Sequence, residues 1–418
     1  MQKLVVVGQG YVGLPLSQGA VHAGLQVTGL ELNKTVVENL NNGISHVDDI
    51  SNDDLSELLQ KGYRASNDPS VIADADVVVI CVPTPLGEAG SPDLGAVIGA
   101  TKTIRDNLSG ETLVVLESTT YPGTTEEICL PILTENGAVL DQNLFLAFSP
   151  ERIDPGNPTY GLKNTPKVVG GMTEESGDRA VAFYSQFIDS VVRAKGAKEA
   201  ETAKLLENTY RHINIALVNE MSKFCNDMDI DLWDVINAAK TKPFGFQAFY
   251  PGPGVGGHCI PIDPNYLSYS VRKSLGYPFR FVELAEEINS SMPRYVVDRV
   301  QNVLNESGKA LKNAKILLLG VTYKPNIADQ RHSPALPVAE AFLERGADIS
   351  FHDPKIEEWF VGDTSFNRVK SLEAAVADVD LVVLLQNHAN YNVDALANAA
   401  KSFFDTRGVS AGDAAVRL

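Results

Sequence analysis

The chain has few cysteines, and they lie far apart. Its four cysteines form no Cys-x-x-Cys pair, and they are Cys81, Cys129, Cys225 and Cys259. Closely spaced pairs are typical of zinc sites and of the disulfide frameworks of small secreted proteins. We therefore expect no bound metal, no disulfide network, and a reducing, cytoplasmic location.

Long hydrophobic runs are also missing. No apolar stretch reaches the length of about 18 residues that a transmembrane helix needs. The chain passes from Met1 directly into the strand-like run Lys3–Val7, without the charged and apolar regions of a signal peptide. We therefore expect no membrane partner and no secretory leader.

Positive charge is scarce as well. The 35 Lys and Arg residues are outnumbered by 53 Asp and Glu residues, which gives a formal net charge of −18. Such a surface repels nucleic acid and anionic membranes, so we expect neither as a partner. A polyanionic substrate would need a locally basic pocket. At 418 residues, the chain is long enough for two or three domains.

The first thirty residues carry a dinucleotide-binding pattern. The apolar run Lys3–Val7 predicts a buried strand, and it leads through Gly8-Gln-Gly-Tyr-Val-Gly13 into the helical stretch Leu14–Ala23. A second predicted strand, Gln26–Leu30, ends at Glu31. Strand, glycines, helix, strand and acid all have the spacing of a Rossmann-type fingerprint.

Each part of this fingerprint has a physical role. The glycines allow the tight turn, the approach of the pyrophosphate and the packing of helix on strand, and the acid accepts the ribose hydroxyls. A carboxylate at Glu31 repels a 2′-phosphate, so it favours NAD over NADP; the alternative is a solvated strand end. The predicted cofactor-binding residues here are Gly8, Gly10, Tyr11, Val12, Gly13 and Glu31.

Three further buried-strand patterns follow, at Asp76–Val82, Thr112–Glu117 and Leu144–Phe148. Open α/β sheets bind ligands beyond the carboxyl ends of their strands. Pro83, Thr84, Thr119 and Glu151 follow these three strand ends, so we expect them to line one crevice. Each of them alone could equally be a turn or cap residue.

The middle of the chain predicts one long helix, from Glu199 to about Met228, without internal glycine or proline. Lys204, Asn208 and Arg211 recur at helical spacing and share one face. A solvated polar face is the ordinary interpretation, but the central position of the helix favours burial. We expect this helix to link two domains and to provide a dimer contact.

The last third predicts a second α/β unit without a Gly-x-Gly-x-x-Gly turn. Its expected elements are Lys315–Gly320, Ala335–Arg345, Asp348–Phe351 and Val379–Leu385. Lys324 and Arg331 lie in the loop after the first of these strands, where cations could bind phosphate, and Arg407 is a further candidate.

A glycine- and proline-rich segment, Phe249–Asp263, surrounds Cys259. Glycines let a backbone approach a ligand closely, and prolines restrict the loop. The alternative is an inert, packed cysteine, but conformationally special loops often carry sites. A metal site made of His258, Cys259 and Asp263 lacks a further ligand at suitable spacing.

The predicted fold is α/β, with two doubly wound Rossmann-like domains joined by a central helical domain that contains the long helix. The expected boundaries are 1–198 for an NAD-binding domain, 199–307 for a central domain with the cysteine loop and the dimer contact, and 308–418 for a substrate-binding domain.

Taken in order, the motifs resemble those of the UDP-glucose/GDP-mannose dehydrogenase family. The matching segments are Gly8–Gly13, Val82–Pro85, Ser118–Thr119, Ser149–Glu151, Lys204 with Asn208, Gly256–Cys259 with Asp263, and Lys324 with Arg331. This resemblance implies oxidation of the C6 alcohol of a nucleotide sugar to a carboxylate with two NAD, without release of the aldehyde.

The resemblance also implies a role for each residue. Cys259 resembles the nucleophile that forms a thiohemiacetal and then a thioester. Lys204, assisted by Asn208, resembles the oxyanion stabiliser, and Asp263 the acid/base residue, while Thr119 and Glu151 would order a water. The implied cofactor contacts are Pro83, Thr84, Thr119 and Arg331. The implied substrate-binding residues are Glu151, Arg152, Lys204, Asn208, Arg211, Tyr250, Gly254, Gly256, Lys324 and Arg407.

The chain departs from the family pattern at two positions, and the first of them bears on the substrate. Pro155 stands where the UDP-glucose branch has a second glutamate, and His258 stands where many relatives have another residue. The segment Ile260–Leu267 resembles UDP-N-acetylglucosamine 6-dehydrogenases, with UDP-N-acetylmannosamine and UDP-glucose as alternatives. Arg152 and Arg211 could contact the acetamido group, and structural ion pairs are an equal possibility.

Two other function classes are weaker. A two-electron dehydrogenase of a hydroxyacid or sugar phosphate would share the glycine fingerprint but would not need Cys259. A catalytically silent nucleotide-sugar sensor could have lost Cys259, Lys204 or Asp263, and all three are present.

Overall fold

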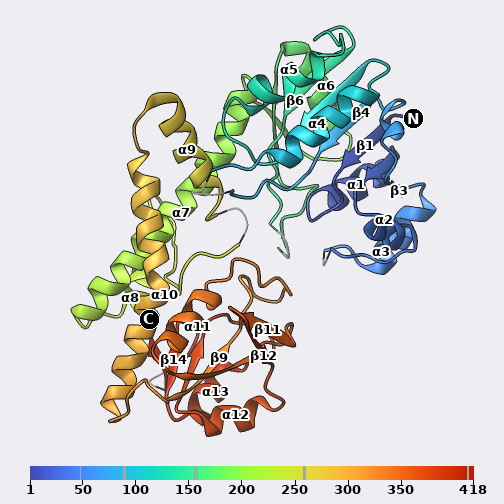
Figure 1. Ribbon diagram of the computed structural model, residues 1–418. Helices are drawn as coiled ribbons and strands as arrows, with labels where there is room; N and C mark the ends of the chain where they lie inside the picture. Colours follow the sequence, from blue (N-terminus) through green and yellow to red (C-terminus); the bar gives the residue numbers. More distant parts are fainter. Residues whose placement is uncertain (48, 88–90, 155–156, 158, 258–259, 412–413) are drawn as a thin grey trace. The chain divides into compact units, whose positions relative to one another are not determined.

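The computed structural model describes residues 1–418 except 48, 88–90, 155–156, 158, 258–259 and 412–413, and it divides into two compact units (Figure 1). The first unit comprises Met1–Glu207 and Asn265–Tyr277, and the second comprises Asn208–Pro264 and Pro278–Leu418. The 31-residue helix α7 (Ala197–Asp227) contributes to both.

The first unit is built on an eight-stranded sheet with the order β3-β2-β1-β4-β5-β6-β7-β8. All neighbouring strands are parallel except β6 and β7. The order reverses beside β1, which is the switch point where doubly wound sheets bind ligands. The strands are β1 (Lys3–Val7), β2 (Gln26–Leu30), β3 (Arg64–Ser66), β4 (Val77–Ile80), β5 (Thr112–Leu116), β6 (Leu144–Phe148), β7 (Lys167–Gly171) and β8 (Val191–Arg193).

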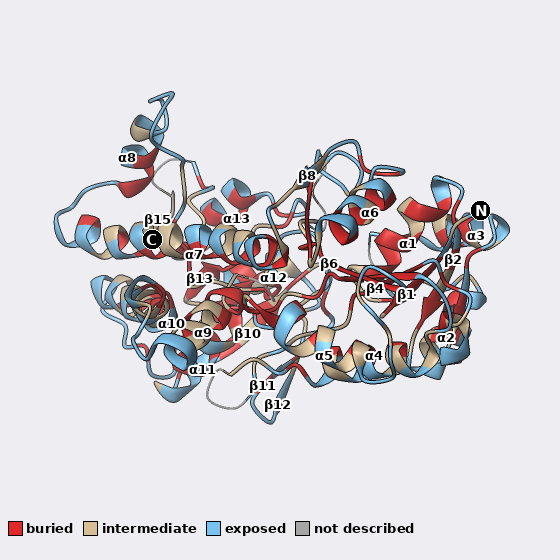
Figure 2. Ribbon diagram, turned by 90° about the horizontal axis from the view of Figure 1, so that it is seen from above, coloured by how far each residue is buried: buried red, intermediate tan, exposed pale blue. Residues whose placement is uncertain are grey.

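Helices cover both faces of this sheet, which is why its central strands are continuous apolar runs. Alternate residues enter two cores: Leu4 and Val6 face one, and Val5 and Val7 the other. Figure 2 shows β1, β4 and β6 as buried strands between α1 and α6 on one side and α4 and α5 on the other. The helical segments are α1 (Gly13–His22), α2 (Lys34–Asn41), α3 (Asn52–Gln60), η1 (Pro69–Ile72), α4 (Gly95–Asn107), η3 (Thr125–Cys129), α5 (Leu130–Thr134) and α6 (Glu174–Tyr184).

The second unit has a five-stranded parallel sheet with the order β10-β9-β13-β14-β15, and a small antiparallel hairpin. The sheet consists of β9 (Lys315–Leu319), β10 (Asp348–His352), β13 (Leu381–Leu384), β14 (Phe403–Asp405) and β15 (Val416–Arg417), and the hairpin of β11 (Glu358–Val361) and β12 (Thr364–Asn367). The helices are α8 (Leu232–Ala239), α10 (Arg280–Glu306), α11 (Ala335–Glu344), α12 (Leu372–Asp378) and α13 (Val393–Ala399), while α9 (Asp263–Leu275) lies at the boundary of the two units.

The predicted fold class is confirmed: two Rossmann-like sheets and the long helix α7 are present, together with a second long helix, α10. The strand predicted at Asp76–Val82 is observed at Val77–Ile80, and beyond its end the Val82 carbonyl accepts the hydroxyl of Ser118. The three-domain boundaries stay a prediction. Among the described residues, no helix is both long and apolar enough to cross a membrane.

Candidate active site

The glycine-rich turn after β1 leaves space at one position only. A Cβ atom on Gly8, whose φ is +92°, would lie 2.6 Å from the carbonyl oxygen of Cys81, and one on Gly13 would lie 1.9 Å from that of Gly8. A Cβ on Gly10 would meet no atom within 4 Å. The first and third glycines are therefore required by the packing of the protein, whereas Gly10 borders space that a pyrophosphate can approach.

Glu31 lies at the carboxyl end of β2, next to this turn. Its carboxylate accepts the main-chain N–H groups of Gln9 and Asn33, each at 3.1 Å. The side chain is only half-buried, so lone pairs remain for ribose hydroxyls. Tyr11 and Val12 are half-buried and pack against the core. These residues fit a bound dinucleotide.

The segments after β4 and β5 are tied together at the same edge of the sheet. The hydroxyl of Ser118 donates to the carbonyl of Val82 at 2.7 Å, and the hydroxyl of Tyr266, on α9, donates to the carbonyl of Thr84 at 2.6 Å. Thr84 and Thr119 are half-buried, and Pro83 is exposed. Val82 and Thr84, on either side of Pro83, are therefore held at this edge by neighbouring side chains.

Glu151 follows β6, and Lys204 of α7 is brought to it. The Lys204 ammonium donates to the main-chain carbonyl of Glu151 at 2.6 Å, and both residues are buried. Arg152 pairs with the Glu207 carboxylate on α7 and donates to the carbonyl of Pro166 at 2.8 Å. Arg152 therefore makes the structural ion pair that the sequence left as an alternative.

A buried ionic cluster beside Glu151 was missed from the sequence. The Lys167 ammonium lies 2.9 Å from Glu117 and 3.6 Å from Glu151, and the Tyr184 hydroxyl donates to Glu117. Burial raises the pKa of Glu117. Burial alone would lower the pKa of Lys167, but the carboxylates of Glu117 and Glu151 raise it overall. A charged residue at the start of a short strand resembles an ordinary solvated strand end, so no sequence signal marks it.

In the second unit, Asn208 and Asp263 are in contact. The Asn208 side-chain amide donates to the Asp263 carboxylate, and Asp263, the first residue of α9, is buried. Lys204 and Asn208 lie one turn apart on α7. Arg211, on the same helix, is exposed.

Two asparagine side chains hold the loop that follows Tyr250. The Asn219 side chain accepts the main-chain N–H of Gly252 at 3.0 Å and donates to Asn289 at 2.9 Å. Both asparagines are buried. Tyr250 itself is exposed and stacks on Trp233, with the ring centroids 5.9 Å apart.

This loop packs against the loop that carries Lys324 and Arg331. A Cβ on Gly256 would lie 2.9 Å from side-chain atoms of both Tyr323 and Pro334, and one on Gly254 would lie 3.1 Å from Pro334. The two predicted substrate loops are therefore in close contact, and only glycine allows their approach.

The cations predicted for the substrate lie in different surroundings. The Arg407 guanidinium donates to the carbonyl of Leu385 at 2.6 Å and lies beside Gly252. Desolvation lowers the pKa of Arg407 to about 10, so it is still a cation at pH 7. Lys324 is half-buried, whereas Arg331 is exposed and forms a two-point ion pair with Asp329.

Cys259, His258 and Pro155 lie outside the described residues. Among the described residues, no group of three or more His, Cys, Asp or Glu side chains could hold a metal ion.

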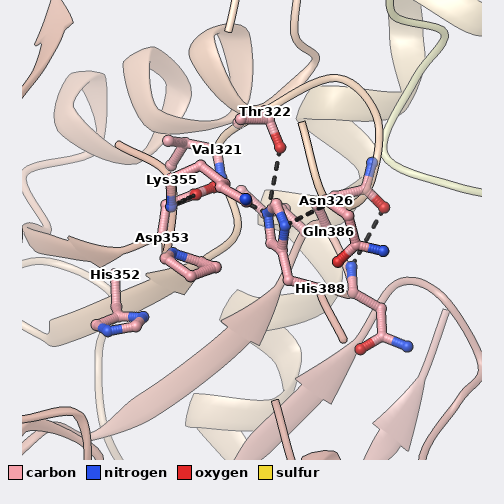
Figure 3. Close-up of polar contacts among 12 residues, drawn as sticks. Val321, Thr322, Asn326, His352, Asp353, Lys355, Gln386 and His388 are labelled. Atoms are coloured by element: carbon pink, nitrogen blue, oxygen red, sulfur yellow. Dashed lines mark hydrogen bonds and ion pairs between the residues drawn. The ribbon is translucent and has the colours of Figure 1, made fainter. Parts of the chain in front are cut away.

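The carboxyl edge of the second sheet holds a buried His–Asp pair that the sequence analysis did not identify (Figure 3). The His388 Nε2 lies 3.0 Å from the Asp353 carboxylate, and its Nδ1 accepts the main-chain N–H of Asn326 at 3.0 Å. Burial alone would raise the pKa of Asp353, but hydrogen bonds led by that from His388 lower it overall. The pair holds the start of the loop that contains Lys324.

Comparison with known families agrees with this arrangement. Three models of the UDP-glucose/GDP-mannose dehydrogenase family match in order: the NAD-binding domain at residues 2–188, the central domain at 198–291, and the UDP-binding domain at 317–411. NAD is thus the cofactor of the first domain.

Similar proteins cover nearly the whole chain. A UDP-N-acetyl-D-mannosamine dehydrogenase of Methanococcus maripaludis is 33% identical over 97% of this chain and 89% of its own length. A UDP-N-acetyl-D-glucosamine 6-dehydrogenase of Salmonella typhi is 34% identical over 85% of this chain and 83% of its own. The solved UDP-D-ManNAc dehydrogenase of Pyrococcus horikoshii has a TM-score of 0.90 at 28% identity and covers 100% of this chain and 99% of its own. The chain therefore belongs to the UDP-glucose/GDP-mannose dehydrogenase family and is an NAD-dependent UDP-sugar dehydrogenase.

Proposed function

We propose that the protein oxidises the C6 hydroxyl of a UDP-N-acetylhexosamine to the uronic acid in a four-electron reaction. The observation that carries this proposal is the buried Lys204 ammonium, held 2.6 Å from the carbonyl of Glu151 at the cofactor-binding edge of the first sheet. A cation there can stabilise the oxyanion of the thiohemiacetal and that of the tetrahedral intermediate formed when water attacks the thioester.

The chemistry assigns one role to each predicted residue. NAD supplies a hydride acceptor for each of the two oxidations. The Cys259 thiolate adds to the C6 aldehyde, and the second oxidation leaves a thioester. Lys204 and Asn208 stabilise the developing oxyanions, and Asp263 gives and takes protons. Water, ordered by Thr119 and Glu151, attacks the thioester carbonyl; the C–S bond breaks, and the cysteine thiolate and the carboxylate are released.

The remaining predicted residues bind the nucleotide sugar. The substrate set is Arg211, Tyr250, Gly254, Gly256, Lys324 and Arg407, and Arg331 serves the cofactor. Because Arg152 pairs with Glu207, Arg211 is the better candidate for a contact to the acetamido group. Relatives named for the manno and the gluco epimer are 33% and 34% identical, so similarity alone does not separate the two. UDP-N-acetylglucosamine remains the first substrate to test, before UDP-N-acetylmannosamine and UDP-glucose.

A panel of these three UDP-sugars tests the proposal. NADH is counted per sugar nucleotide consumed, and kcat/KM is compared between substrates. Two NADH and one uronic acid are expected from an N-acetylhexosamine, and Cys259→Ser should stop before the acid forms. One NADH with a released aldehyde, or a preference for UDP-glucose, would refute it.

The same helix supports a homodimer. An exposed apolar stripe follows α7 at spacings of four and seven residues and consists of Leu206, Tyr210, Leu217 and Phe224, with Met228 directly after the helix. Leu206 and Met228 are 66% and 60% exposed. Such a stripe requires a covering surface, and a second copy of α7 supplies one. A monomeric mass by light scattering at micromolar concentration would exclude this dimer. A cytoplasmic location is proposed with it, and cell fractionation tests that.

A further inference from the structure

The register of one antiparallel strand pair aligns a lysine with Glu151. Strands β6 and β7 pair Ala147 with Gly171 and Phe148 with Gly170. Continued three residues past the end of β6, this register puts Glu151 opposite Lys167. Because β7 runs against its neighbour, it begins at the edge where β6 ends. The fold therefore places Lys167 at the ligand-binding edge of the sheet.

Lys167 lies between two carboxylates, away from water. Its ammonium is 2.9 Å from Glu117 and 3.6 Å from Glu151, and the side chains of Lys167, Glu117 and Glu151 are 4%, 0% and 11% exposed. It also lies 5.2 Å from the centre of the Tyr184 ring. Burying three charges is costly, and one ammonium neutralises only one of two carboxylates. Such an arrangement needs a reason other than stability.

The two carboxylates differ in what they can reach. Glu117 has no exposed surface and is occupied by Lys167 and the Tyr184 hydroxyl. Glu151 accepts the main-chain N–H of Ile153, has Lys167 beside its other oxygen, and retains some exposed surface. Lys204 fixes the main-chain carbonyl of the same residue. Glu151 is thus held at its carbonyl by one lysine and at its carboxylate by another.

We propose that Lys167, with Glu117 as its counter-ion, is a positioning residue that orients the Glu151 carboxylate and keeps it ionised to accept a proton from the water that hydrolyses the thioester. This inference rests on the proposed function. Water adds to the thioester carbonyl, Glu151 takes its proton, and the C–S bond breaks to release the thiolate. Lys167 touches neither substrate nor cofactor in this role.

The charge of Lys167 should therefore determine the pH dependence of thioester hydrolysis. Besides Lys167, the titratable and charged groups around Glu151 are Glu117 after β5, Cys81 after β4, Tyr184 from α6, Lys204 from α7 and the adjacent Arg152. Without the ammonium, one buried carboxylate holds a proton at neutral pH, so hydrolysis requires a higher pH. Without the negative charge of Glu117, Lys167 acts on Glu151 alone, so hydrolysis should extend to a lower pH.

The test uses the full-length enzyme with the UDP-sugar that it turns over best. Lys167→Met should retain a rapid burst of NADH, accumulate the thioester on the protein by mass spectrometry, and lose about 100-fold in steady-state rate. Its pH profile should move up by about one unit or more, and Lys167→Arg should recover most of the rate. Glu117→Gln should move the profile in the opposite direction, which keeps the test decisive if Lys167→Met does not fold.

Arg179→Met is the matched control. Arg179 is a paired cation of the same unit that lies over Phe145, and it contacts none of the residues of this cluster. It should hydrolyse the thioester at the normal rate and pH. Two results would overturn the inference: a folded Lys167→Met with the normal pH profile, or a profile of Glu117→Gln that moves up or stays unchanged. The NADH stoichiometry of the unsubstituted enzyme reports separately on the proposed function.

Discussion

The two sheets of the molecule use the same turn after their first strand. Gly8 follows β1 and Gly320 follows β9, both with positive φ, and each donates its N–H to the last residue of the second strand, at 2.8 and 2.9 Å. A Cβ on Gly8 would lie 2.6 Å from the carbonyl oxygen of Cys81, and one on Gly320 would lie 2.3 Å from that of Gln386. In both cases the clash is with the chain that leaves the strand on the other side of the first strand, which is β4 in one sheet and β13 in the other.

The acids that follow the second strands accept equivalent hydrogen bonds but differ in burial. Glu31 accepts N–H groups from Gln9 and Asn33, and Asp353 accepts them from Val321 and Lys355, at the equivalent positions. Glu31 remains half-exposed, whereas Asp353 is fully buried against His388 (Figure 3). The same turn therefore leaves an acid partly exposed in one sheet and buries an acid that stabilises a loop in the other.

The largest effect is expected from substitutions that disrupt the turn shared by the two sheets. Gly8→Ala and Gly320→Ala should each destabilise their own unit by about 4 kcal/mol or more, because a Cβ at positive φ meets a main-chain carbonyl. Gly10→Ala is the control: it should cost about 1 kcal/mol or less while raising KM for NAD at least about tenfold. Urea unfolding and NAD titration measure both effects. Equal destabilisation by Gly8→Ala and Gly10→Ala would contradict the steric argument.

Next in size is the buried acid of the second sheet. Asp353→Asn should destabilise the protein by about 3 kcal/mol, because it breaks a buried pair with His388 that also fixes the N–H of Val321. NAD binding should be retained. Thermal unfolding with and without NAD measures this, and a variant as stable as the parent protein would show that the pair is dispensable.

Two buried acids, Glu201 and Asp353, should affect the stability of the protein in opposite ways as the pH changes. Glu201, on α7, accepts N–H groups from Gly123 and Thr125, but burial raises its pKa from 4.5 to about 7, whereas the pKa of Asp353 is lowered. The contribution of Glu201 to the free energy of unfolding is fully present below pH 4.5 and is lost as the pH rises through about 7. This loss amounts to about 3 kcal/mol. The contribution of Asp353 is present above its unfolded pKa and is lost as the pH falls below it.

The difference between parent and Glu201→Gln isolates the first of these effects. Between pH 5 and 8 the melting temperature of the parent should fall relative to that of Glu201→Gln. A constant difference over this range would mean that Glu201 does not titrate there.

The smallest effect on stability is expected at Glu31. Glu31→Gln should change the unfolding free energy by about 1 kcal/mol or less, because the side chain is half-exposed. KM for NAD should rise several-fold and discrimination against NADP should weaken, since the repulsion of a 2′-phosphate is removed. Comparing kcat/KM for both cofactors measures this. Unchanged discrimination would place the ribose elsewhere.

The elements that a local sequence pattern specifies could be predicted from the sequence. The run Lys3–Val7 alternates between two buried faces, so it reads as a central strand, and β1 has these bounds. The glycines of the first turn were identified because their spacing is itself the signal. Gly320 has the same conformation without that spacing, so the likeness of the two turns emerges only in three dimensions.

Residues whose role depends on pairing between distant segments were not predicted. Lys167 resembles a solvated strand end until the β6–β7 register places it opposite Glu151. The pair of Arg152 with Glu207 joins a loop to a helix 55 residues later, and nothing local separates it from a substrate contact. His388 and Asp353 are likewise 35 residues apart.

The ionic cluster around Lys167 also has a consequence for biosynthesis. Glu117 and Tyr184 are 67 residues apart, and Lys167 lies between them in the chain. While the protein is being synthesised, strands β1 to β6 emerge from the ribosome before any partner for the Glu117 carboxylate exists. A nascent chain must therefore keep this acid hydrated or protonated until Lys167 and then Tyr184 have emerged. We expect the first sheet to become protease-resistant only after that point.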